Sequence, residues 1–179
     1  MVMLIQANSL LSSTIISLHT GQPIGQISKT IINPHKLAIL GFYVTSQWTK
    51  NKAQDLVLLS RDIRDLNPKR VMVNSIDELV EEDDLPGVID ILEIKYELIH
   101  KSVRTEQGKR LGKVDDYVID NSDFEIQKIY VRQSVFKSVN EHSFIIDRSQ
   151  IIEVNDKQVI VADAVSSESV KATQQQPAV

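Results

Sequence analysis

The stretch Gly21-Gln-Pro-Ile-Gly25-Gln-Ile-Ser-Lys-Thr-Ile-Ile32 recurs 87 residues later as Gly108-Lys-Arg-Leu-Gly112-Lys-Val-Asp-Asp-Tyr-Val-Ile119. Both glycines return at the same places, and each aliphatic position of the first stretch is aliphatic in the second. The same register reaches Tyr43-Val44 and Tyr130-Val131, and after one extra residue the spacing becomes 88. Identities in register with the hydrophobic pattern predict two homologous domains.

The pattern of each copy is typical of short β-strands, rich in β-branched residues and partly alternating between apolar and polar. The strands expected are Ile24–Ile32, Leu37–Val44, Leu56–Leu59 and Val71–Val73 in the first copy, and Leu111–Ile119, Phe124–Val131, Phe144–Ile146 and Val159–Val161 in the second. Turn formers separate them at Asn33-Pro-His35, Asn67-Pro-Lys-Arg70, Asp120-Asn-Ser122 and Asn155-Asp-Lys157. An open sheet of about five or six short strands cannot hide one face, so the fold class expected is mainly β, with two small closed barrels.

The segment between the copies has a different pattern. Ser75 can cap a short helix over residues 76–80, and apolar residues between Val88 and Ile94 predict a second one. The acidic run Glu81–Asp84 between them is interpreted as an exposed linker. The expected organisation is a first domain at residues 9–76, a helical linker at 77–95, a second domain at 96–165 and a disordered tail at 166–179.

Composition narrows the function classes. Of the 179 residues 42% are apolar, which is enough for a packed core. The absence of cysteine excludes a disulfide framework, a thiolate zinc site and a cysteine nucleophile. With 20 basic and 24 acidic side chains the formal net charge is −4, which argues against nonspecific coating of nucleic acid. The N-terminal stretch has too many polar residues for a membrane span and lacks the basic start of a secretory signal, so we expect a cytoplasmic protein.

The motif from Gly108 to Val114, the strand end Ile129-Tyr-Val131 and the closing Asn155-Asp-Lys-Gln-Val-Ile-Val161 together resemble the PRC-barrel family. This family is named after the cytoplasmic domain of the photosynthetic reaction centre H subunit. The first copy resembles the same module, so the resemblance covers roughly residues 9–76 and 96–164. It implies a tandem pair of PRC-like barrels. The shared motifs are structural and imply no chemistry.

The repeated glycines are interpreted as turn and bulge positions. Gly21 and Gly108 stand where a tight turn favours positive φ, and Gly25 and Gly112 stand inside a strand pattern, where glycine marks a bulge or a bend. The alternative is a phosphate-binding loop, since residues 108–113 spell G-x-x-x-G-K. That motif needs one more residue before the lysine and a Ser or Thr after it. The structural interpretation is therefore favoured.

Other residue types that carry chemistry form no recognisable site. The histidines His19, His35, His100 and His142 lack metal-ligand spacing and fall at non-equivalent repeat positions. The acids between Asp115 and Glu125 can bind a hard cation in principle, but a solvated hairpin is favoured, because no calcium-loop pattern is present. No nucleophile motif surrounds a serine. We expect no catalytic residue, no bound metal and no cofactor.

Trp48 is the single tryptophan and lies in a polar stretch between two expected strands, near Lys50 and Lys52. One interpretation is a lid that closes the end of a barrel. The other is an anchor for a partner, because tryptophan is over-represented among interface hot spots.

Three functions are weighed. The first is a non-catalytic adaptor, because the reaction-centre subunit and the archaeal cell-division scaffolds of the resembled family work through protein contacts. The second is a ribosome maturation factor that binds a small-subunit ribosomal protein or rRNA, although that family has a different N-terminal barrel. The third is an enzyme or small-molecule binder, for which the sequence offers no polar constellation. The adaptor is preferred, with unknown protein partners, contact with a peripheral membrane complex left open, and homodimerisation through edge strands left open.

Overall fold

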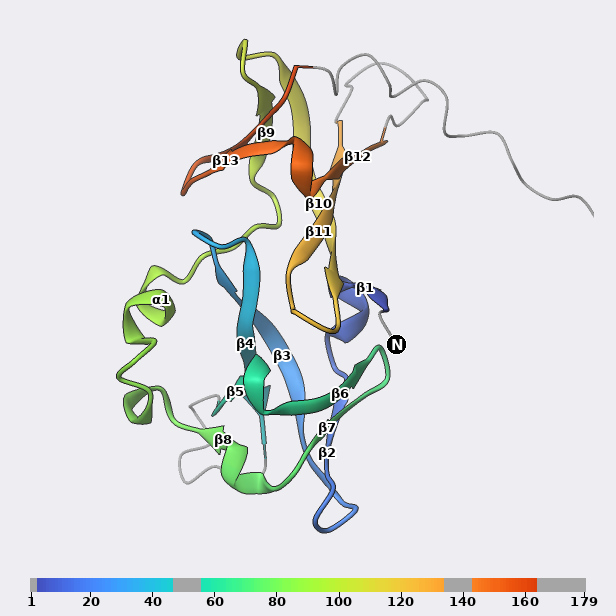
Figure 1. The fold of residues 1–179 in the computed structure, drawn as a ribbon, viewed down its shortest axis with the longest axis vertical. Coiled ribbons are helices and arrows are strands. Elements are labelled where there is room, and N and C mark those ends of the chain that lie inside the picture. The colour runs from blue at the N-terminus through green and yellow to red at the C-terminus, as the bar shows by residue number, and fades with distance from the viewer. Residues whose placement is uncertain (1–2, 47–55, 134–142, 164–179) are drawn as a thin grey trace, which may run out of the picture. The chain divides into compact units, whose positions relative to one another are not determined.

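The computed structural model describes residues 3–46, 56–133 and 143–163, which are mainly β (Figure 1). The chain divides into two compact units. The first unit holds residues 1–97 together with residues 117–127, and the second holds residues 98–116 and 128–179. No helix in the described parts is long and apolar enough to cross a membrane.

The strands form two hydrogen-bonded paths. The first path runs β6-β7-β2-β3-β4-β5-β8, with bounds β2 Thr14–Ser17, β3 Pro23–Asn33, β4 Ala38–Thr45, β5 Leu56–Leu59, β6 Ile63–Asn67, β7 Arg70–Val73 and β8 Leu79–Val80. The second path runs β12-β11-β10-β9-β14-β13, with bounds β9 Ser102–Thr105, β10 Arg110–Asp120, β11 Ile126–Arg132, β12 Ser143–Asp147, β13 Ile151–Val154 and β14 Gln158–Val161. The remaining strand, β1 (Leu4–Gln6), pairs with the end of β10 that belongs to the first unit. The strands expected from the sequence are all present, with ends shifted by one or two residues.

The two paths have the same order of strands. In each, the first strand of the repeat pairs in parallel with the last, so that Ile15 lies opposite Val71 in β2 and β7, and Val103 lies opposite Val159 in β9 and β14. All four side chains are fully buried. The apolar pattern that repeats along the sequence thus fills equivalent places in both paths.

Asparagine turns hold the last hairpin of each path. The side-chain oxygen of Asn67 accepts hydrogen bonds from the backbone of Lys69 and Arg70 at 3.2 and 3.1 Å. The side chain of Asn155 accepts the corresponding bonds from Lys157 and Gln158, both at 3.0 Å. An Asx turn of this kind depends only on the residues that form it, and so it could be predicted from the local sequence.

Short helical turns connect the strands. They are the 3-10 helices η1 Ala7–Leu10, η2 Ser60–Asp62, η3 Ile76–Glu78, η4 Glu82–Asp84 and η5 Arg148–Gln150, and the α-helix α1 Ile89–Ile94. Ser75 caps η3, as the sequence predicted, and the structure adds a capping box with Glu78. The expected helix over residues 76–80 was wrong at its end, because Leu79 and Val80 pair with β5 and form β8.

The closed barrels expected from the sequence are absent from the described residues. Each path has two open ends, at β6 and β8 in one and at β12 and β13 in the other. Closure was expected because a small sheet must cover its apolar face. In the first unit the linker covers that face instead, since Leu85 and Leu92 join Ile31, Val57 and Leu59 in one buried cluster.

The ends of two equivalent hairpins pair with each other inside the first unit. The backbone of Ile39 donates to Phe124 at 2.8 Å, and the backbone of Ile126 donates to Leu37 at 3.0 Å. The two bonds exchange equivalent residues, because Leu37 and Phe124, like Ile39 and Ile126, are 87 positions apart. This part of the first unit is therefore locally two-fold symmetric, although its halves have different sequences.

Candidate interaction surface

The repeated glycines occupy two kinds of backbone position. Gly21 has φ +68° and Gly108 has φ +82°, and neither has an atom within 4 Å of the place where a Cβ would stand. A Cβ on Gly25 would lie 2.7 Å from the Val44 side chain, and one on Gly112, at φ +150°, would lie 2.3 Å from the carbonyl oxygen of Arg132. The pairing register shifts beside both Gly25 and Gly112, in β2–β3 and in β9–β10. These positions let strands approach closely.

The remaining sequence candidates do not converge. Trp48 and His142 lie outside the described residues. His19 follows β2, His35 lies in the β3–β4 turn, and His100 precedes β9, so they stand on three separate segments. In the described parts of the chain, no group of three or more His, Asp or Glu side chains is arranged to hold a metal ion.

Several acids of residues 115–125 form ion pairs or hydrogen bonds within the β10–β11 hairpin. Asp115 forms an ion pair with Arg132 at 2.7 Å, and Asp116 is buried at 8% exposure. Asp120 accepts hydrogen bonds from the backbone and the hydroxyl of Ser122 at 2.8 and 2.6 Å. Asp123 accepts one from the backbone of Glu125 at 2.8 Å. The carboxylates around the turn are thus hydrogen-bonded to the turn itself.

The hydrogen bonds from Ser122 are expected to change the pKa of the Asp120 carboxyl, which can be measured. The hydroxyl of Ser122, and then its backbone N–H, lower the pKa of Asp120 below its ordinary value. A lowered folded-state pKa adds stability above the unfolded pKa, and this stability is lost as the pH falls through the folded value. In an NMR titration of the side-chain carboxyl carbons we expect S122A to raise the pKa of Asp120. An unchanged value in this variant would contradict the hydrogen-bonded turn.

The outer edge of the first path is covered by the linker. β5 pairs with β4 on one side and with β8 on the other, where Val57 lies opposite Val80 and Leu58 opposite Leu79. Val57 and Leu58 are completely buried. Strand β8 therefore protects this edge from further pairing.

No described strand covers the equivalent edge in the second unit. β12 pairs with β11, and no other described strand pairs with it. Ile145, which corresponds to Val57, is 52% exposed, whereas Val57 is 0% exposed. An apolar side chain on a strand with a free edge is a ready place for a further strand to bind.

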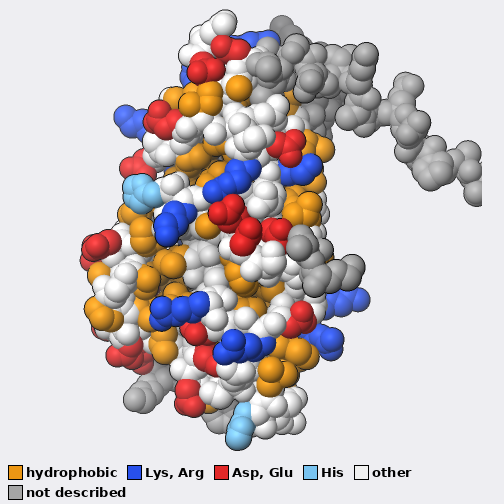
Figure 2. Space-filling model, in the orientation of Figure 1, with side chains coloured by type: hydrophobic (Ala, Val, Ile, Leu, Met, Phe, Trp, Pro, Cys, Tyr) orange, Lys and Arg blue, Asp and Glu red, His pale blue; other side chains and the backbone are white. Residues whose placement is uncertain are grey.

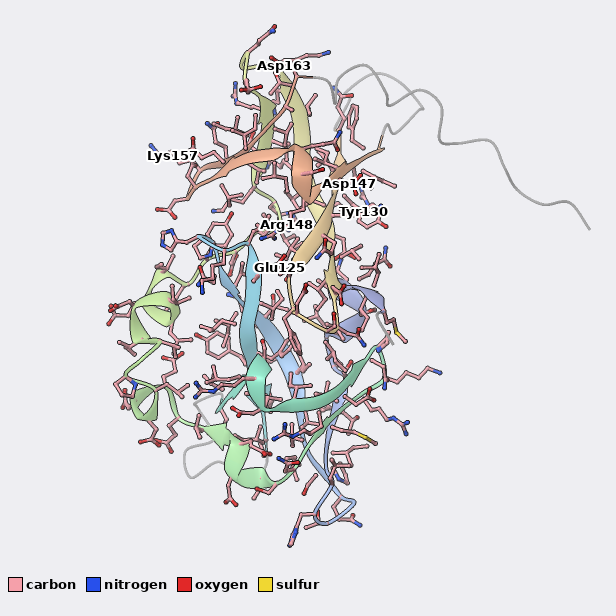
Figure 3. The ribbon with its side chains drawn as sticks, viewed as in Figure 1. Glu125, Tyr130, Asp147, Arg148, Lys157 and Asp163 are labelled. Carbon is pink, nitrogen blue, oxygen red and sulfur yellow. The ribbon has the colours of Figure 1, made fainter. Side chains whose placement is uncertain are left out.

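The face around Ile145 combines apolar and charged groups. Tyr130 lies directly opposite Ile145, and Lys128 lies opposite Asp147. Because side chains alternate along a strand, these four residues share one face, and we call them the β12 surface. The Nζ of Lys128 lies 3.3 Å from a carboxylate oxygen of Asp147, whose position at the end of β12 is labelled in Figure 3. An apolar centre with a charged rim is the usual composition of a protein interface.

The opposite face of the same strands is the core of the second unit. Ile129, Val131 and Ile146 are 0% exposed, and Phe144 is 9% exposed. The sequence pattern predicts this strand but not the exposure of Ile145. The residues Phe144-Ile-Ile146 are all apolar, so they lack the apolar–polar alternation that distinguishes an exposed face from a buried one. The signal that could have indicated this exposure is the repeat. A linker with apolar residues follows the first copy, whereas residues rich in Ser and Gln follow the second.

Comparison with protein families identifies one segment of the chain. Residues 94–167 match the family model of the PRC-barrel domain, which confirms the resemblance for the second copy. The same resemblance for residues 9–76 stays a prediction. No curated protein matches the chain.

Proposed function

We propose that this chain, whose residues 94–167 belong to the PRC-barrel domain family, is a non-catalytic adaptor that binds a protein partner through the β12 surface. The family assignment is consistent with a module that works by contact. The observation that carries the proposal is the difference between Val57, covered by the linker, and Ile145, which is exposed on an edge that no further described strand pairs with.

The shared strand order supports a second part of the proposal. The two copies have the same sequence of pairings, including the parallel pair of first and last strands. We therefore propose that both copies are PRC-like modules, arranged as open sheets rather than closed barrels. In the first copy the linker occupies the edge that a partner occupies in the second.

The surface charge agrees with selective contacts. Within each unit, the described residues on the face drawn in Figure 2 show acidic, basic and apolar side chains interspersed. A protein that binds nucleic acid nonspecifically presents an extended basic surface instead. This face is better suited to a protein partner.

The test is affinity purification of the full chain from its native cells, followed by mass spectrometry, with the wild type compared with I145K. We expect I145K to lose the partner, because a lysine on the edge strand opposes both apolar contact and strand addition. The matched control is I152K, since Ile152 on β13 is 53% exposed and lies outside the β12 surface.

The same experiment separates the adaptor from its alternatives. Recovery of small-subunit ribosomal proteins or rRNA would replace the adaptor by a ribosome maturation factor. A partner retained equally by I145K and the wild type would exclude the β12 surface. Light scattering of the purified protein identifies a homodimer, which I145K converts to a monomer if β12 pairs with a second copy.

A further inference from the structure

The bulge glycines mark two equivalent hollows, one in each unit. The hollow of the first unit surrounds Gly25 and has a volume of about 270 Å³. The hollow of the second unit surrounds Gly112 and has a volume of about 710 Å³. Both lie where the register shifts between the first two strands of a copy, which are β2 and β3 in the first and β9 and β10 in the second.

The linings of the two hollows differ in charge at corresponding positions. In the first unit they include Pro23, Gln26 and Thr45, which are all neutral. The residues 87 positions later are Arg110, Lys113 and Arg132, which are all basic and all line the second hollow. Since the pairing register shifts at both places, the three basic side chains are a property of the second unit and not of this strand arrangement.

Two of these cations have no counter-ion among the described residues. Arg132 pairs with Asp115 inside the hollow. Arg110 and Lys113 take part in no ion pair within the described parts of the chain. Counted over the described residues, the hollow therefore has two positive charges without an ion-pair partner, in a protein whose formal net charge is −4. Such a local concentration attracts anions.

The hollow is not a phosphate-binding loop. In such a loop the glycines let backbone N–H groups approach a phosphate, and a Ser or Thr follows the lysine. Here the space beside Gly112 is filled by the carbonyl of Arg132, and the residue after Lys113 is Val114, which is 1% exposed. Recognition of an anion must come from the side chains.

We propose that this basic groove, formed by Arg110, Lys113 and Arg132, binds an acidic segment of a protein partner. The Arg132–Asp115 pair shows that a carboxylate fits among these cations, and two further carboxylates would satisfy Arg110 and Lys113. A continuous phosphate backbone is disfavoured, because Asp115 lies in the groove and the whole chain is negative. Arg132 follows Tyr130 by two residues on β11 and so shares its face.

The inference rests on the proposed function in taking a protein as the ligand, but it involves other residues than Ile145. The probe is a short fluorescein-labelled peptide of alternating Glu and Ser, titrated with the full chain and followed by fluorescence anisotropy. The test variant is R110Q/K113Q, which makes the groove resemble that of the first unit. The control is K69Q/R70Q, which removes the same charge from exposed positions of the β6–β7 hairpin.

We expect R110Q/K113Q to weaken peptide binding about fivefold or more, and K69Q/R70Q to change it less than about twofold. Binding of the wild type is expected to weaken as salt is added. Equal affinity of R110Q/K113Q and the wild type would overturn the proposal. It would also fail if inorganic phosphate alone displaced the peptide at equal concentration, or if single-stranded RNA of equal charge bound more tightly.

The two proposals fail in different ways. I145A is expected to bind the acidic peptide as the wild type does, because Ile145 does not line the groove and the substitution changes no charge. If R110Q/K113Q loses the peptide but retains the cellular partner, the groove binds an acidic segment of a different protein. Loss of the partner in I145K alone leaves the groove result unaffected.

Discussion

Replacement of Gly112 by alanine will destabilise the second unit by about 3 kcal/mol or more. Two causes act together at this position. A φ of +150° is available to glycine and strained for any residue with a Cβ, and the new Cβ would stand 2.3 Å from the carbonyl oxygen of Arg132. The obstacle is backbone, so it cannot turn aside as a side chain can. Strands β10 and β11 must separate.

Thermal unfolding followed by circular dichroism measures this loss, which corresponds to a decrease in Tm of about 6–12 °C. The control is G21A. Gly21 also has positive φ, but nothing lies within 4 Å of its missing Cβ, so only the conformational cost of about 1 kcal/mol remains. If the two variants lost equal stability, the close approach of Arg132 would be refuted as the reason for Gly112.

The glycines also show how far local sequence predicts structure. A turn such as the one at Asn67 depends on its own residues, and the strands depend on an alternation that is visible in the sequence. β8 depends on β5, which is more than twenty residues away, and a helical pattern over Leu79 and Val80 concealed it. The pairing of Leu37 with Ile126 joins residues that are much further apart in the sequence. Contacts of this kind depend on the tertiary structure as a whole, and the local sequence pattern does not indicate them.

The candidate surfaces were accessible in the sequence only through comparison of the copies. Ile145 resembles any core residue until it is aligned with Val57 and the linker is seen to cover one and not the other. The basic groove likewise becomes visible when Gln26 is set against Lys113 and Thr45 against Arg132. A single copy contains no standard for judging which exposed or charged residues are unusual, and the repeat supplies one.

The same comparison predicts a second large effect, on the free energy of unfolding. V57K is expected to be far more destabilising than I145K. Val57 is 0% exposed and packs in the cluster with Leu85 and Leu92. An unpaired ammonium at that place is expected to cost about 4 kcal/mol or more of the free energy of unfolding. Ile145 is 52% exposed, so I145K is expected to change the same quantity by less than about 0.5 kcal/mol.

Chemical denaturation of both variants measures the difference, and alanine variants protect the test in case V57K does not fold. V57A is expected to lose about 2 kcal/mol and I145A less than about 1 kcal/mol, in the same order as the lysine variants. If I145K were as destabilised as V57K, Ile145 would be covered in the folded protein. Its failure to bind a partner would then reflect unfolding. If I145K is stable, its loss of binding is a property of the β12 surface. Strand β8 pairs with the equivalent edge in the first unit, so an edge of this kind accepts a further strand.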